Sequence, residues 1–215
     1  MKAEFIFDTV CPWCYLGKVR FVRALRLRPD LRIQIRWTPF MLNPEMPLSG
    51  ADRQSFMERK FGGPSRVQRL NNAVIEAGKA EGIKFNFDRM YRTPSSLHSH
   101  RFIKFAAQYG LQVPAIDMVF KGYFKEGVDI GQVEELIELG VELGMSEIEL
   151  ARYLYSDLDF ATVLNDNART HRLGVSGVPC VIIDDKYAIS GAQETDVLLR
   201  LLDVAAENQF EQVSG

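Results

Sequence analysis

The chain has 215 residues, of which 47% are hydrophobic and 25% charged, and its formal net charge is −2. This composition is ordinary for a soluble globular protein, and the small net charge gives no reason to expect nucleic acid or an anionic membrane as a partner. The sequence has neither a basic and then apolar leader nor about 20 consecutive apolar residues, so we expect a cytoplasmic protein without a membrane partner, although a mature secreted protein would also lack its leader. Three cysteines are an odd number, which disfavours a framework of structural disulfides.

The first forty residues predict a strand, a helix and a second strand. Residues 3–8 form a short apolar run, and the helical pattern that follows extends from Pro12 to near Pro29. Residues 33–37 alternate between apolar and polar side chains, which is the period of a strand.

Cys11-Pro12-Trp13-Cys14 lies at the turn between the first strand and the first helix. Proline suits the first helical position, so Cys11 is expected at the N-cap, where unpaired N–H groups and the helix dipole favour a thiolate. Cys14 lies one turn later and is more shielded. This pattern is typical of a redox pair in which the first cysteine attacks and the second resolves. Two buried structural cysteines are the alternative, whereas a metal site is not expected because no second paired cluster supplies its ligands.

The rest of the chain predicts a helical block followed by a return to strands. Helical patterns cover 52–61, 64–81, about 95–109, 114–125, 133–141, a short segment after Ser146, and 157–173. Residues 179–184 form a continuous apolar run, as in a strand buried on both faces, and 187–189 form another strand before a last amphipathic helix. The outline is a compact α/β unit, with helices covering a mixed sheet, into which the helical block is inserted.

Pro179 directly precedes that buried strand, where the missing N–H group is unusual. With the paired cysteines, four segments resemble the FrnE-like branch of the DsbA family, in the thioredoxin superfamily. They are Asp8-x-x-Cys11-Pro12-Trp13-Cys14-Tyr15-Leu16-Gly17-Lys18, Pro39-Phe40-x-Leu42-Asn43-Pro44, Gly177-Val178-Pro179 and Ser190-Gly191-Ala192-Gln193.

The resemblance implies a DsbA-like α/β fold, a thioredoxin fold with a large all-helical insertion. We expect residues 1–43 and 157–215 in the thioredoxin-like domain and residues 44–156 in the inserted helical domain. The resemblance further implies thiol–disulfide chemistry, with Cys11 as nucleophile, Cys14 as resolving thiol and Pro179 as a cis residue facing them.

Further candidates follow from position. Trp13, Val178, Asn43 and Gln193 are candidate substrate-binding residues, and Gln193 is expected to open the last helix. Asp8 is a candidate proton relay for Cys14, or a carboxylate that only binds N–H groups of the following turn. Cys180 is either a small core residue or a third redox thiol.

The leading hypothesis is a cytoplasmic thiol–disulfide oxidoreductase without a bound cofactor. Its substrates would be proteins or small molecules with a disulfide or thiol, and glutathione is a candidate co-substrate. The alternative is a glutathione-dependent isomerase or transferase of the 2-hydroxychromene-2-carboxylate isomerase or kappa class, whose members usually carry serine at the nucleophile position. A third hypothesis is a binding or chaperone-like module whose cysteines are incidental.

Overall fold

The computed structural model describes the backbone of residues 1–213 and the side chains up to residue 208. Two compact units are present: Met1–Phe40 with the chain from Asn167 onward, and Met41–Asp166. The boundary between them falls inside helix α8 (Phe160–Arg172), so that only the end of this helix belongs with the first unit. That end joins the first unit because Arg169 binds Glu4 on the first strand.

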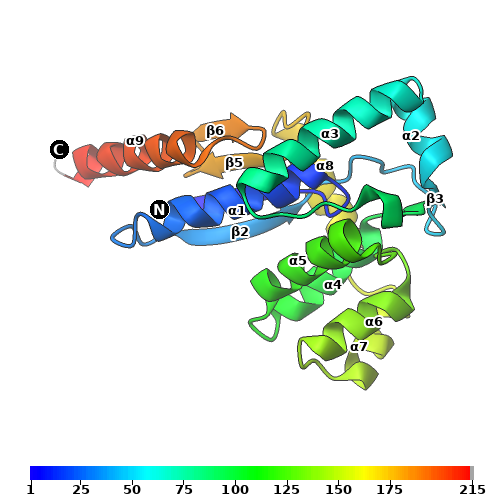
Figure 1. The fold of residues 1–215 in the computed structure, drawn as a ribbon. Helices are drawn as coiled ribbons and strands as arrows, with labels where there is room; N and C mark the ends of the chain where they lie inside the picture. The colour runs from blue at the N-terminus through cyan, green and yellow to red at the C-terminus, as the bar shows by residue number, and fades with distance from the viewer. Residues whose placement is uncertain (214–215) are drawn as a thin grey trace. The chain divides into compact units, whose positions relative to one another are not determined.

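A four-stranded mixed sheet in the order β2-β1-β5-β6 forms the centre of the first unit (Figure 1). Strand β1 (Lys2–Phe7) is parallel to β2 (Gln34–Pro39) and antiparallel to β5 (Cys180–Ile183), which pairs with β6 (Tyr187–Ser190). The parallel pair needs a crossover connection, and helix α1 (Pro12–Arg26) provides it. Helix α9 (Thr195–Val213) follows β6. The α/β class predicted from the sequence is confirmed.

Different elements cover the two faces of the sheet, because side chains alternate along β1. Phe5 faces α1: its ring centroid lies 5.4 Å from that of Phe21 on α1 and 5.1 Å from that of Trp37 on β2. Glu4 points to the opposite face, where it meets Arg169 at the end of α8. Burying the aromatic cluster of the first face is a main source of stability for this unit, since each large aromatic side chain removes about 150–250 Å² from water.

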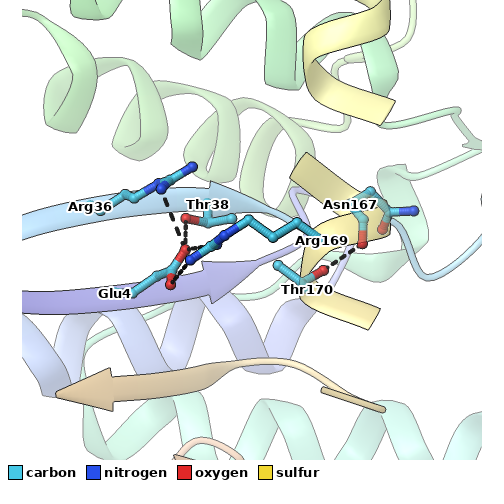
Figure 2. A network of polar contacts seen from close by, with 6 residues as sticks. All are labelled: Glu4, Arg36, Thr38, Asn167, Arg169 and Thr170. Atoms are coloured by element: carbon cyan, nitrogen blue, oxygen red, sulfur yellow. Dashed lines mark hydrogen bonds and ion pairs between the residues drawn. The ribbon is translucent and has the colours of Figure 1, made fainter. Parts of the chain in front are cut away.

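Figure 2 shows the polar network on the α8 face of the sheet. Arg169 donates two hydrogen bonds of 2.6 and 3.0 Å to the Glu4 carboxylate, the Thr38 hydroxyl donates a third of 2.5 Å, and Arg36 lies 3.7 Å away. Burial alone would raise the pKa of Glu4, but the hydrogen bonds from Arg169 and Thr38 and the charges of Arg169 and Arg36 outweigh it and lower that pKa. The network joins β1 and β2 to the helix that precedes the loop containing Pro179.

The second unit is mainly helical. It contains α2 (Arg53–Phe61), α3 (Pro64–Ala80), α4 (Leu97–Ala107), α5 (Gln112–Lys121), α6 (Val133–Glu142) and α7 (Glu147–Leu154) (Figure 1). A 3-10 turn at Phe87–Arg89 and a π turn at Gly122–Glu126 lie between helices. Two short strands, β3 (Ala51–Asp52) and β4 (Arg92–Thr93), form an antiparallel pair that was not predicted, because two residues show no alternation. Within residues 1–213, no helix combines the length and the apolar character needed to cross a membrane.

Arg101 on α4 is the largest side chain that is fully buried in the second unit. Its guanidinium donates hydrogen bonds of 2.6–3.0 Å to four main-chain carbonyls that follow or end α7, those of Tyr153, Leu154, Ser156 and Leu158. It also lies 4.2 Å from the ring centroid of Phe160. Because the last carbonyls of a helix have no partner within the helix, Arg101 caps α7 from a neighbouring helix.

Candidate active site

Both cysteines of the C-x-x-C motif lie at the start of α1. Cys11 is the N-cap residue, with φ −96° and ψ 112°, and Pro12 occupies the first turn, as the sequence predicted. The Cys11 carbonyl accepts hydrogen bonds from the N–H groups of Cys14 and Tyr15, at 3.0 and 3.4 Å. Both thiols are free. The Cys11 side chain is therefore attached at the positive end of the helix dipole, which favours negative charge.

Cys14 is the more enclosed of the two thiols: its exposed fraction is 0%, against 5% for Cys11 and 38% for Trp13. The main-chain N–H of Asp8 donates to the Cys14 sulfur at 3.5 Å. Burial, followed by a hydrogen bond with Cys11 and the charge of Cys11, raises the pKa of Cys14 well above its ordinary value. Cys14 therefore holds its proton at neutral pH, and a group must remove that proton before Cys14 can act as a nucleophile.

The loop before β5 contacts Cys11 through the backbone. The Val178–Pro179 peptide bond is cis, and the Cys11 thiol donates to the Val178 carbonyl at 3.7 Å. Within residues 1–213, the Val178 N–H group has no hydrogen-bond acceptor. A main-chain N–H and C=O next to a reactive sulfur can pair with an extended peptide as a strand would.

Pro179 packs directly on α1 because position 17 has no side chain. A Cβ atom at Gly17 would lie 2.7 Å from Pro179 Cγ and 3.3 Å from Pro179 Cβ. Both distances are shorter than the roughly 3.5–4.0 Å of an ordinary carbon contact. In the sequence, Gly17 stands out only as part of the motif that follows Cys14, and this packing role was not predicted. The available signal was a glycine inside a predicted helix, which usually has a packing reason.

Asp8 follows β1 and is fully buried beside Cys14. Its carboxylate accepts a hydrogen bond of 3.3 Å from the Val10 N–H group, which is the turn-binding role proposed from the sequence. Its negative charge is a minor contribution to the raised pKa of Cys14, after burial and the effects of Cys11. Asp8 is therefore placed both to bind the N–H groups of the following turn and to act as a proton relay for Cys14.

Cys180 lies in an apolar cluster with Ile6, Phe40 and Val175. It is paired with Ile6 across β1 and β5, so its side chain points to the sheet face opposite α1. Burial raises the pKa of Cys180, although a hydrogen bond from Ser190, at 3.8 Å, opposes this effect. These surroundings are those of a small core residue.

Gln193 and Asn43 are the remaining candidates. Gln193 does not open the last helix: α9 begins two residues later, and the Gln193 amide donates instead to the Ser190 carbonyl at 2.7 Å. Asn43 lies in the second unit, where its side-chain oxygen accepts a hydrogen bond from Lys60. It lines a groove of about 670 Å³ together with residues that include Leu42, Met46, Phe56, Arg59 and Lys60.

Comparison with known proteins establishes the family. Residues 3–203 match the model of the DSBA-like thioredoxin domain. The chain is a member of the DSBA-like thioredoxin family. Membership of the DsbA family, predicted from the motifs, is thereby confirmed, and so is the thioredoxin fold.

Solved structures agree with this assignment. The DsbA-family chain is 27% identical to a probable DsbA oxidoreductase from Streptomyces coelicolor, with a TM-score of 0.89 over 96% of this chain and 90% of that one. A 2-hydroxychromene-2-carboxylate isomerase is 18% identical, with a TM-score of 0.70 over 100% and 98% of the two chains. The cytosolic disulfide reductase DsbM from Pseudomonas aeruginosa, solved with GSH, is 17% identical, with a TM-score of 0.66 over 99% of both chains. The last two likenesses concern the fold alone.

Proposed function

We propose that this DsbA-family protein is a thiol–disulfide oxidoreductase that acts through Cys11 and Cys14. The observation that carries the proposal is the pairing of two free thiols in unlike environments at one helix start. Cys11 lies at the N-cap against the Val178 carbonyl, whereas Cys14 is fully buried and protonated. An attacking and a resolving thiol need that difference.

In the reductive direction, the Cys11 thiolate attacks one sulfur of a substrate disulfide. A Cys11–substrate disulfide forms, and the other substrate sulfur leaves as a thiolate that takes up a proton. Cys14 then loses its proton and attacks the Cys11 sulfur, which forms the Cys11–Cys14 disulfide and releases the second substrate thiol. The substrate gains two electrons and the cysteine pair loses two, which an external thiol such as glutathione restores. The oxidative direction is the reverse.

Asp8 is the proposed acceptor of the Cys14 proton. Support comes from its burial beside Cys14, with its own N–H group 3.5 Å from that sulfur. Asp8→Asn keeps the shape but loses the base, so we expect resolution of the mixed disulfide to slow by on the order of 10²-fold, the lower end of general acid–base effects. An unchanged resolution rate in Asp8→Asn would leave Asp8 with the turn-binding role only.

Trp13 and Val178 are the proposed substrate contacts. Trp13 is the most exposed residue of the motif region and Val178 offers main-chain groups, so a disulfide-containing peptide could lie between them. Asn43 and Gln193 stay candidates for a contact with peptide or glutathione. The proposed location is the cytoplasm, in analogy with the cytosolic reductase DsbM.

The alternative function is a glutathione-dependent isomerase or transferase. One observation favours it, the fold shared over the whole chain with 2-hydroxychromene-2-carboxylate isomerase. In that case Cys11 would hold or activate glutathione, and Cys14 would have no part in the chemistry.

Cys11→Ser and Cys14→Ser variants distinguish the two functions. Each variant is assayed for reduction of insulin disulfides and for glutathione-dependent isomerisation or conjugation, and its adducts are identified by mass spectrometry. We expect Cys11→Ser to be inactive, and Cys14→Ser to lose turnover while accumulating mixed disulfides on Cys11. Near-full activity of Cys14→Ser without a mixed disulfide would refute the oxidoreductase and favour the glutathione-dependent function. Alkylation of Cys11 should abolish disulfide exchange and impair glutathione chemistry. A wild-type protein that shows neither enzymatic activity and binds its partner equally well after this alkylation would be a binding module instead.

A further inference from the structure

Arg20 is a charged side chain on α1 whose exposed fraction is only 7%. Its guanidinium donates a hydrogen bond of 2.8 Å to the Ala192 carbonyl and forms an ion pair of 2.7 Å with Glu194. Both partners lie in the loop between β6 and α9. Burying an arginine is unfavourable unless its hydrogen bonds are made, and here Ala192 and Glu194 supply partners for the guanidinium.

The loop that Arg20 holds is hydrogen-bonded to Pro179, the residue after the Val178 carbonyl that contacts Cys11. The Gly191 N–H group, directly before Ala192, donates a hydrogen bond of 2.7 Å to the Pro179 carbonyl. The Ala192 Cα atom and the Pro179 ring also lie 3.5 and 2.7 Å from the place where Gly17 would carry a Cβ atom. Pro179 is thus enclosed between α1 and the 190–194 loop.

These contacts form a continuous series of interactions within the first unit that begins and ends at Cys11. Cys11 is the N-cap residue of α1, and the same helix carries Arg20, which donates a hydrogen bond to the Ala192 carbonyl. The adjacent Gly191 binds Pro179, and the Val178 carbonyl before Pro179 returns to the Cys11 sulfur at 3.7 Å. The Arg20 hydrogen bond to Ala192 is one of the contacts by which α1 holds the 190–194 loop.

We propose that Arg20 is a positioning residue that fixes the Val178–Pro179 segment at the distance from Cys11 that a peptide substrate needs. This role rests on the proposed function, because it assumes that a peptide disulfide pairs with Val178 while Cys11 attacks. Arginine suits the task because its planar fork binds two acceptors in fixed directions, whereas lysine is a point charge on a flexible stem.

The Ala192 carbonyl, rather than Glu194, is the partner that matters in this proposal. Glu194 has an exposed fraction of 69%, and exposed ion pairs contribute little because water screens them. Glu194→Gln should therefore behave like wild type, whereas Arg20→Met should not.

The test compares two reagents that alkylate Cys11: chloroacetamide, and an extended peptide carrying a chloroacetamide group. The small reagent needs no contact with Val178, whereas the peptide does, so the ratio of the two rates reports the geometry of the segment without any disulfide turnover. We expect Arg20→Met to lower this ratio about tenfold, since a 1 Å misplacement costs up to about 10²-fold. Arg20→Lys should give an intermediate ratio, and the rate with chloroacetamide should stay unchanged in both variants.

Arg28→Met is the matched control. Arg28, which lies just after the end of α1, binds α9 through hydrogen bonds of 2.6 and 2.7 Å to Asp203 and does not bind the 190–194 loop. We expect its ratio of rates to equal that of wild type even where its melting temperature falls as far as that of Arg20→Met. Equal ratios in Arg20→Met and Arg28→Met would overturn the proposal, as would an equal loss in Glu194→Gln. Failure of wild type to exchange disulfides at all would refute the proposed function instead, and it is measured separately.

Discussion

Replacing Gly17 by alanine tests whether the contact between α1 and Pro179 sets up the site. The added Cβ atom would lie 2.7 Å from Pro179 Cγ, about 0.8 Å short of the lower limit of a normal carbon contact. A change of ring pucker moves mainly Cγ, whereas Pro179 Cβ would also lie only 3.3 Å away, and the Pro179 carbonyl is held by the Gly191 N–H group. Relief therefore requires a shift of the Pro179 segment away from α1.

Two opposing contributions determine the stability of Gly17→Ala. Overpacking costs about 1–3 kcal/mol, and alanine in a helix gains about 0.8–1.0 kcal/mol over glycine. The free energy of unfolding should accordingly fall by about 0–2 kcal/mol. The effect on disulfide exchange should be larger, about 10-fold or more in kcat/KM, because a displacement approaching 1 Å costs up to about 10²-fold in a positioned reaction.

Gly122→Ala is the control, since a Cβ atom at Gly122 would meet Leu139 and Val128 at 3.5 Å, an ordinary contact. Its backbone is helical, with φ −55°, so it should be as stable as wild type or up to about 1 kcal/mol more stable. Urea denaturation gives the free energies, and exchange with a peptide disulfide gives the rates. A Gly17→Ala variant with the stability gain of Gly122→Ala and wild-type kinetics would refute the close packing of Pro179 on α1.

Three further predictions concern buried polar and sulfur groups. Arg101→Met should lower the free energy of unfolding, measured in urea, by on the order of 3 kcal/mol, because each buried carbonyl left without a donor costs about 1–3 kcal/mol; a loss below 1 kcal/mol would contradict the capping role. Because the pKa of Glu4 is lowered from 4.5 in the folded protein, the stability of wild type over Glu4→Gln should be full above about pH 4.5 and decline as the pH falls from there through the lowered folded-state pKa. A difference that does not shrink as the pH is lowered would contradict this. Cys180→Ala should keep the wild-type exchange rate while losing about 1 kcal/mol of stability, and a large loss of activity would instead indicate a third redox thiol.

Periodicity and turn chemistry predicted most of the fold. The strand at residues 3–8, the helix from Pro12 and the apolar strand after Pro179 all appear, because each local pattern agrees with its final surroundings. The N-cap position of Cys11 was also predictable, since it depends only on the adjacent Pro12.

Contacts between distant segments were not predictable. The roles of Gly17 and Arg20 depend on how the 190–194 loop meets α1, and no local pattern encodes that meeting. Gln193 was misplaced because helix starts are uncertain by a few residues in a sequence, and here the side chain binds the preceding Ser190 carbonyl instead.

The order of strands has a consequence for synthesis of the protein on the ribosome. Strand β1 ends at Phe7, yet one of its two neighbours, β5, begins at Cys180. At about 5–20 residues per second, the nascent chain carries Cys11 for many seconds before the Val178–Pro179 segment that contacts it has been made. The contiguous second unit, Met41–Asp166, is meanwhile fully translated. The contact between Cys11 and the Val178 carbonyl is thus acquired late, and newly made chains are most open to unwanted oxidation at Cys11 during that interval.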